Sequence, residues 1–311
     1  MKLFEAFTGI GAWHKAFSKL NIPIELIGFS EINQNAIDSY SLIHNINENI
    51  NIGDISNLHK INDDIDILCY SPPCQSYSMA GSKKGLNDER GQLIYDVFEL
   101  IDIHRPKYCL MENVKGLRTK KFRNEFKLIL DTLDMLNYNS YVQILNAKDY
   151  GIPQNRERVF IVSIRNDIDK CNYQFPQPIP LKKSLSDILE QDAELPILHN
   201  IYGGFKETKP RLFYDYSPTI RTSSGGGHIP SVVTNDISKI EKTIDSYDIR
   251  KLSTLECMRL MDFDDSDLIK IKSLNISNTQ IYKLIGNSIV VNVIEEILKS
   301  LFGGIKNEHK T

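Results

Sequence analysis

A cysteine follows two prolines in the run Ser71-Pro72-Pro73-Cys74-Gln75, directly after the apolar stretch Ile65 to Tyr70. If that stretch is a β-strand, Cys74 lies at the carboxyl edge of a sheet, where α/β folds place their ligands. A thiol there can act as a nucleophile when its thiolate is favoured and substrate can reach it. The alternative is a small buried apolar residue, which describes Cys69 and Cys109 inside predicted strands. The two prolines stiffen the backbone beside Cys74, and this favours a functional thiol.

A long polar loop, Ser76 to Gln92, follows the cysteine. It contains glycines and basic residues, namely Gly81, Lys83, Lys84, Gly85, Arg90 and Gly91. Glycines allow such a loop to move, and lysine and arginine side chains can contact phosphates. A solvated surface loop without a ligand is the alternative. The loop is therefore a candidate for contact with a phosphate-bearing substrate.

A carboxylate and two guanidiniums are predicted at the same edge. Glu112-Asn113-Val114 ends the apolar run Lys107 to Met111, and a glutamate buried there could stay protonated and act as an acid. Gln154-Asn155-Arg156-Glu157-Arg158 opens the next run, Val159 to Ile164. The alternative for these charges is a surface ion-pair cluster.

Glycines and acids end the first strands of the chain. The turn Phe7 to Ala12, with Gly9 and Gly11, follows one strand and precedes a helix, so a ligand could approach its backbone. Many such turns only join a strand to a helix. Glu31 ends the next strand, and Asp54 follows a predicted third short strand. Each acid alone reads as a surface residue, but together the three strand ends favour a nucleoside cofactor.

The elements that must position these groups alternate between short apolar runs and helix-periodic segments. This order predicts an α/β fold with a mainly parallel sheet. The predicted strands are Leu3 to Phe7, Ile24 to Phe29, Ile65 to Tyr70, Lys107 to Met111, Tyr141 to Leu145 and Val159 to Ile164. Apolar residues at steps of three and four predict a helix from Phe122 to Leu136.

The pattern changes after about Asp167, where prolines and short turn-punctuated runs replace the alternation. A weak helix is predicted near Ser184 to Leu189, and Val290, Ile294, Ile297 and Leu301 share one face of a C-terminal helix. We therefore predict a catalytic domain over residues 1–183, a smaller domain over 184–267, and a hinge with a C-terminal helix over 268–311 that returns to the first domain.

Composition limits the class of protein. With 311 residues, a net charge of −3 and a pI of about 6.2, the chain does not hold nucleic acid by bulk positive charge, so any DNA contact is local. Its five cysteines form no CxxC pair and no zinc-like cluster, which predicts a reduced cytosolic protein without a metal. No run of about 18 apolar residues occurs, and we expect neither export nor a membrane span.

The ordered set of motifs resembles the cytosine-C5 DNA methyltransferase family of bacteria, of restriction-modification or orphan type. The matching segments are Phe7 to Gly11, Glu31, Gly53 to Ile55, Pro72 to Gln75, Arg90-Gly91, Glu112 to Val114, Gln154 to Arg158, Arg250 to Ser253, Glu256 to Leu260 and Gly286 to Val290. Ala12, Tyr70 and Ile32 depart from the usual pattern, which leaves details of the adenine contact open.

The resemblance implies a Rossmann-like, S-adenosylmethionine-dependent fold with a smaller target-recognition domain. It implies that Cys74 adds to C6 of a flipped-out cytosine, that protonated Glu112 hydrogen-bonds N3, and that Arg158 lies at O2 with Arg156 in support. The expected cofactor-binding residues are Phe7, Gly9, Gly11, Glu31, Ile32, Asp54, Ile55, Pro73, Leu93 and Asn287. The expected DNA-binding residues are Ser78, Lys83, Lys84, Arg90, Thr219, Arg221, Ser223, Ser224, Gly226, Gly227 and His228. A flexible hairpin loop without base contacts is the alternative for the segment from Ser217 to His228.

The implied partner is double-stranded DNA, with a cognate restriction endonuclease acting separately, and we expect a cytoplasmic monomer. One rival is a tRNA cytosine-C5 methyltransferase, because a eukaryotic branch of the fold uses the same nucleophile on RNA. A second rival is an inactive homologue that binds cofactor or DNA as a regulatory module. An adenine or small-molecule methyltransferase fits less well, because that reaction needs no covalent cysteine. The target sequence, and the base that removes the C5 proton, do not follow from the sequence.

Overall fold

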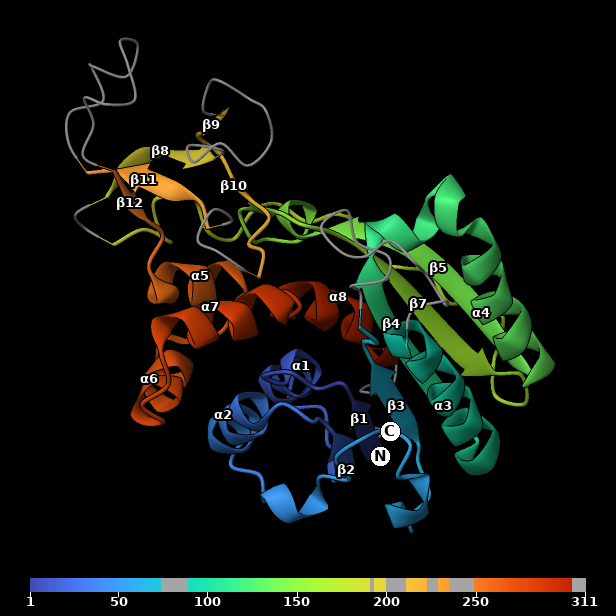
Figure 1. Cartoon of the computed structure of the whole chain (residues 1–311). Helices are drawn as coiled ribbons and strands as arrows, with labels where there is room; N and C mark the ends of the chain where they lie inside the picture. Colours follow the sequence, from blue (N-terminus) through green and yellow to red (C-terminus); the bar gives the residue numbers. More distant parts are fainter. Residues whose placement is uncertain (74–88, 191–192, 200–210, 223–228, 235–248, 304–311) are drawn as a thin grey trace, which may run out of the picture. The chain divides into compact units, whose positions relative to one another are not determined.

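The computed structural model describes residues 1–73, 89–190, 193–199, 211–222, 229–234 and 249–303 (Figure 1). Several predicted site residues lie outside this part of the chain, namely Cys74, Ser78, Lys83, Lys84, Ser223, Ser224, Gly226, Gly227 and His228. For Arg90 only the backbone is described. The chain divides into two compact units, the first comprising residues 1–145, 157–177 and 295–311, and the second residues 146–156 and 178–294. These bounds differ from the predicted domain limits at 183 and 267, which stay a prediction.

The first unit contains a six-stranded sheet in the order β2-β1-β3-β4-β7-β5. Its strands are β1 (Lys2–Ala6), β2 (Glu25–Ser30), β3 (Ile67–Tyr70), β4 (Tyr108–Val114), β5 (Tyr138–Asn146) and β7 (Glu157–Arg165). The pairs β1–β2, β1–β3 and β3–β4 are parallel, whereas β4 and β7 are antiparallel. The predicted α/β fold with a mainly parallel sheet is therefore confirmed, with a strand at each predicted apolar run.

Helices cover both faces of this sheet. They are α1 (Ala12–Lys19), α2 (Gln34–His44), α3 (Glu89–His104) and α4 (Arg123–Met135), the last matching the predicted helix from Phe122 to Leu136. In β1, Phe4 and Ala6 pack in a core that includes side chains of α3 and α4. Glu5, between them, points to the opposite face, where its carboxylate contacts α1 and α2. Figure 1 shows α1 and α2 (blue) on one side of the strands and α3 and α4 (green) on the other.

Three local predictions were wrong. The third short strand before Asp54 is a single parallel bridge between Phe29 and Asn51, because the Asn47 side chain caps a 3-10 turn at Glu48–Ile50. The polar loop after Cys74 ends earlier than predicted, because α3 begins at Glu89. Residues 184–189 form a turn, in which Leu185 accepts from Ile188, rather than a helix. The remaining short 3-10 helices are Leu58–Lys60, Lys115–Arg118, Lys120–Phe122 and Ala147–Asp149.

The second unit combines a small antiparallel sheet with helices. The sheet has the order β12-β11-β8-β9, formed by β8 (Glu194–His199), β9 (Arg211–Phe213), β11 (Ser231–Val233) and β12 (Ile249–Lys251). A separate parallel pair joins β6 (Gln154–Asn155) to β10 (Ser217–Pro218). The helices are α5 (Thr254–Leu260), α6 (Asp265–Ser273) and α7 (Asn278–Asn287), and α8 (Val291–Phe302) begins here and continues into the first unit.

Glu256 closes a capping box with Ser253 at the start of α5, and Arg250 pairs with the same carboxylate. The charged motif from Arg250 to Glu256 therefore fixes the junction between β12 and α5.

Candidate active site

Glu112 and Arg158 form an ion pair at one edge of the sheet. Glu112 lies near the end of β4 and is 8% exposed. Arg158 is on β7, opposite Val114 in the antiparallel ladder, and its Nε lies 3.0 Å from Glu112 Oε1. The two predicted catalytic residues thus lie together where β4 ends and β7 begins, and a planar guanidinium beside a carboxylate could hold a polar ring edge.

Asn113 joins this edge to the segment that leads to Cys74. Its side chain is buried, and Nδ2 donates to the carbonyl oxygen of Pro72 at 3.2 Å. The same side chain accepts from Val114 N at 2.8 Å, so both ends of the amide are used. Pro72, which is two residues before Cys74 in the sequence, is therefore bonded to the residue that follows Glu112.

The glycine turn after β1 has a backbone that only glycine adopts easily. Gly9 and Gly11 have φ values of 54° and 80°, and Phe7, at 58°, is a rare non-glycine residue in this region. A Cβ added at Gly9 would meet nothing within 4 Å, so this backbone borders open space. At Gly11 the same atom would lie 2.4 Å from the His44 side chain. The turn thus leaves one side open for a ligand and packs tightly on the other.

The carboxylate of Glu31 is held by three backbone amides. Gly9 N donates to Oε2 at 3.0 Å, and the amides of Ile32 and Asn33 donate to Oε1, each at 2.9 Å. Asn51, which sequence reasoning missed, braces the same place. Its Oδ1 accepts from Glu31 N and Gly53 N, and its Nδ2 donates to Glu31 O. An asparagine two residues before a glycine was the only available signal for this role.

The other predicted cofactor residues of the first unit differ in exposure. Asp54 is exposed and accepts from both the amide and the hydroxyl of Ser56, at 2.9 and 2.8 Å. Ile55 is buried, Leu93 packs against the core, and Ile32 is 73% exposed. Pro73 is half-buried. An open glycine backbone, two carboxylates and adjacent apolar side chains fit a nucleoside with a charged tail, as the resemblance requires.

A buried group of titratable side chains lies beneath the glycine turn. The Tyr40 hydroxyl donates to Glu5, and His14 Nδ1 lies 3.7 Å from the same carboxylate. Burial raises the pKa of Glu5 to about 7 and lowers the pKa of His14 to about 4. His44 stacks against both His14 and Tyr40, and its Nε2 lies 3.0 Å from Ile10 O in the turn. The turn therefore rests on a cluster in which burial favours the uncharged forms of Glu5, His14 and Tyr40.

Arg156 does not share the environment of Arg158. It belongs to the second unit, is 3% exposed, and donates to the backbone carbonyls of Ile220, Gly286 and Ser288. A surface ion-pair cluster is thus the wrong description of this residue. Thr219 is half-buried and donates to Asn155 O at 2.6 Å. Arg221 is half-buried, and Asn287 is exposed at the end of α7.

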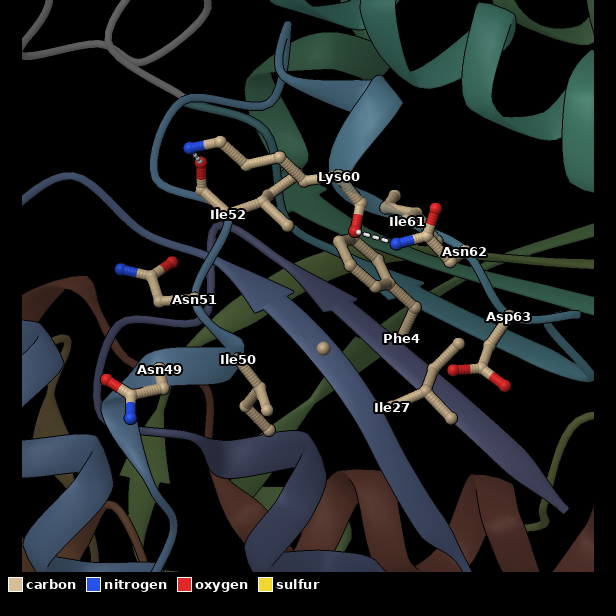
Figure 2. A pocket seen from close by; sticks show the side chains of 11 residues that line it. Phe4, Ile27, Asn49, Ile50, Asn51, Ile52, Lys60, Ile61, Asn62 and Asp63 are labelled. Carbon is tan, nitrogen blue, oxygen red and sulfur yellow. Dashed lines mark hydrogen bonds between the residues drawn. The ribbon is translucent and has the colours of Figure 1, made fainter.

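A pocket of about 250 Å³ lies over β1 and β2 in the first unit (Figure 2). Its lining consists of Phe4, Ile27, Gly28, Asn49, Ile50, Asn51, Ile52, Lys60, Ile61, Asn62 and Asp63. None of these was predicted as a site residue, although Asn51 also braces Glu31.

Within the described part of the chain, no cluster of three or more histidine, cysteine or acidic side chains could hold a metal ion. In the same residues, no helix has the length and hydropathy needed to cross a membrane.

The chain is similar to known proteins in both sequence and fold. The family described as C-5 cytosine-specific DNA methylase matches residues 1–303. The type II methyltransferase M2.ScrFI of Lactococcus lactis subsp. cremoris is 33% identical, and the match covers 97% of this chain and 99% of that protein. The type II methyltransferase M.HhaI of Haemophilus parahaemolyticus is 30% identical over 96% of this chain and 93% of that protein. The crystal structure of S. pombe Dnmt2 methyltransferase has a TM-score of 0.72 at 21% identity, covering 98% of this chain and 99% of that chain, which shows a shared fold.

Proposed function

Because the chain belongs to the C-5 cytosine-specific DNA methylase family, we propose that it transfers a methyl group from S-adenosylmethionine to C5 of a flipped-out cytosine. The chain is a DNA cytosine methyltransferase by this membership. The proposed part is the route, which runs through a covalent bond between Cys74 and C6 of the base in a short, specific duplex site. The observation that carries the proposal is the Glu112–Arg158 pair, 3.0 Å apart, beside the anchored segment that leads to Cys74.

Cytosine C5 is a weak nucleophile while the ring is aromatic, so the ring must be activated first. The Cys74 thiolate adds to C6, which pushes electron density toward C5 and leaves charge at N3 and O2. Protonated Glu112 donates a hydrogen bond to N3, and Arg158 donates to O2. After methylation of C5, a base or water removes the C5 proton and the bond to Cys74 breaks. The ion pair places both groups at one edge. N3 and O2 of the base replace the contact between them, and Glu112 takes up a proton as that contact opens.

The described cofactor residues fit S-adenosylmethionine, which supplies an electrophilic methyl group when bound. Gly9 exposes backbone to open space, and the oriented Glu31 carboxylate can accept from the two ribose hydroxyls. Asp54 offers a second carboxylate, while Ile55 and Leu93 supply apolar contact. The predicted contact of Asn287 is part of the same proposal.

The target base must leave the duplex before Cys74 can reach C6, and this costs a few kcal/mol. We assign compensation for that cost to Ser78, Lys83, Lys84 and Arg90 after the nucleophile, and sequence recognition to the segment containing Thr219 and Arg221. Double-stranded DNA is therefore the proposed partner, read from the major groove. We also propose that the protein acts as a cytoplasmic monomer, and that any cognate restriction endonuclease works separately.

The proposal is tested by supplying labelled S-adenosylmethionine with either duplex DNA or total tRNA. Label should enter DNA, and bisulfite sequencing of DNA from cells expressing the protein should then give the target site. Label that enters only tRNA would refute the DNA substrate, and no transfer to either would favour the inactive homologue.

DNA with 5-fluorocytosine at the target site provides a second test. The C5 fluorine cannot leave as a proton does, so the enzyme should be trapped on the DNA through Cys74 in the presence of cofactor. A denaturing gel followed by peptide mapping measures this adduct. Turnover without any trapped species would count against covalent catalysis.

A further inference from the structure

The segment Pro153 to Arg156 serves as a template for residues 217–222, which we name the stem because they begin the predicted recognition segment from Ser217 to His228. Ser217 N donates to Pro153 O at 2.8 Å, and β10 pairs with β6 in parallel register. Ile220 N donates to Gln154 Oε1 at 3.1 Å. The stem is thus bonded to the template at Ser217 and again at Ile220.

Arg156 completes this bonding from a buried position. Its Nη1 donates to Ile220 O at 2.7 Å, and its Nη2 donates to Gly286 O at 2.9 Å and Ser288 O at 2.6 Å. Loss of one of these acceptors would leave a buried N–H group of the guanidinium without that bond, which is costly, so displacement of these carbonyls is resisted. Because the acceptors are backbone carbonyls, these hydrogen bonds fix the path of the main chain. One side chain therefore sets the distance between the stem and the end of α7.

The end of α7 limits the stem from the other side. A Cβ added at Gly286 would lie 2.6 Å from Thr222 N and 2.7 Å from the carbonyl carbon of Arg221. Real Cβ atoms do not approach backbone this closely, so the stem backbone packs directly on Gly286. The stem is consequently held between the template and α7, as far as Arg221 and Thr222.

We propose that Arg156, together with Gln154, is a positioning residue for target selection, and that it acts by holding the stem rather than by touching the reacting base. This rests on the proposed function, because it takes double-stranded DNA as the partner whose bases are read by the segment containing Thr219 and Arg221. A hydrogen-bonding pattern on base edges is discriminated only if the reading groups are held within a fraction of an ångström. Loosening the stem therefore lowers discrimination between the target and a near-identical site more than it lowers the rate of methyl transfer.

The test compares Arg156→Lys and Gln154→Met with the wild-type protein and with Arg259→Lys. Lysine keeps the charge of Arg156 but cannot reach three carbonyls, and methionine keeps the size of Gln154 but loses both polar atoms. Arg259 is in the same unit and pairs with exposed Asp265, so its change controls for a general arginine effect. Fluorescence anisotropy without cofactor measures binding to a target duplex and to one with a single altered base pair.

In Arg156→Lys and Gln154→Met, we expect the ratio of the dissociation constant for the altered duplex to that for the target duplex to fall about tenfold. One wrong base pair typically costs about 1–3 kcal/mol. Arg259→Lys should keep the wild-type ratio. The kcat on the target duplex should change less than the ratio does. An unchanged ratio of dissociation constants with a lowered kcat in both Arg156→Lys and Gln154→Met would overturn the inference. If Arg156→Lys does not fold, Gln154→Met decides alone. Failure of the proposed function would appear differently, as a wild-type protein that methylates no DNA.

Discussion

Arg156 and Arg158 are two residues apart, but they are bonded in opposite ways and belong to different units. Arg158 faces a carboxylate at the edge of the first unit's sheet, whereas Arg156 is buried against backbone carbonyls of the second unit. An ion pair at an edge can rearrange when a substrate brings its own polar atoms. A guanidinium bonded to three backbone carbonyls has no such freedom. The difference separates Arg158, which is proposed to take part in the reaction, from Arg156, which is proposed to fix the path of the chain.

The strongest test of this separation removes the nucleophile. Cys74→Ala should lower methyl transfer at least about 10⁴-fold, because no other thiol can replace a covalent step. Binding of S-adenosylmethionine, measured by calorimetry, should stay within about twofold. Cys171→Ala, at an exposed free cysteine, is the matched control and should keep full activity. If the Cys74 variant turned over near the wild-type rate, Cys74 would not be the nucleophile of the reaction.

The next largest effect is expected at Glu112. Glu112→Gln keeps the shape and an acceptor for Arg158 but cannot transfer a proton to N3, so kcat should fall about 10²- to 10³-fold. Discrimination between the target and an altered site should remain as in the wild type. Steady-state kinetics on both duplexes measures the two quantities. Loss of discrimination in this variant would mean that chemistry and selection are not separated as the two arginines suggest.

Glu5 extends the comparison. The cluster beneath the glycine turn contains Glu5, which titrates near neutral pH, whereas the hydrogen bonds that hold the stem involve no group that titrates there. The folded protein holds a proton on Glu5 up to about pH 7, so Glu5 lowers stability as pH rises from about 4.5 to about 7. His14 has the opposite sign, since its contribution is lost as pH falls from 6.5 to about 4. In the wild type the pH dependences of stability that Glu5 and His14 contribute oppose each other between about pH 4.5 and pH 6.5.

Glu5→Gln removes one of these pH dependences. The variant should become more stable relative to wild type by up to about 3 kcal/mol between pH 4.5 and pH 7, as urea unfolding at several pH values would measure. Tyr40, His14 and Cys69 face this carboxylate and remain unchanged in the experiment. Parallel stability curves for the two proteins would show that Glu5 does not titrate in this range.

The smallest effect is expected at Asn113, which touches neither base nor cofactor in the proposed reaction. Asn113→Ala leaves the Pro72 carbonyl without this donor and should lower kcat about tenfold by loosening the approach to Cys74. Asn139→Ala removes a comparable amide that bonds Asp169 and controls for loss of an asparagine. A wild-type kcat in Asn113→Ala would show that Cys74 is positioned by other contacts.

The sequence predicted the sheet and the meeting of Glu112 with Arg158, because apolar runs mark strands and strand ends share an edge. It did not predict the burial of Arg156, whose neighbours include Glu157 and Arg158 and therefore suggest a surface. The acceptors that bury it are carbonyls at Ile220, Gly286 and Ser288, and a backbone carbonyl leaves no mark on residue type. The brace at Asn51 was missed for a related reason, since a strand was expected where a side-chain cap bends the chain.

Asn51 has a further consequence, because it lies beside the last strand on one side of the first unit's sheet. β2 pairs with β1 on its inner side, and at its outer side Phe29 is bridged to Asn51, with Ile52 N donating to Phe29 O at 2.8 Å. An open strand of this kind is where a second chain can add itself and start aggregation. The residue that braces Glu31, the proposed cofactor-binding acid, therefore also shields the margin of the sheet. Substitution of Asn51 should reduce solubility as well as cofactor affinity.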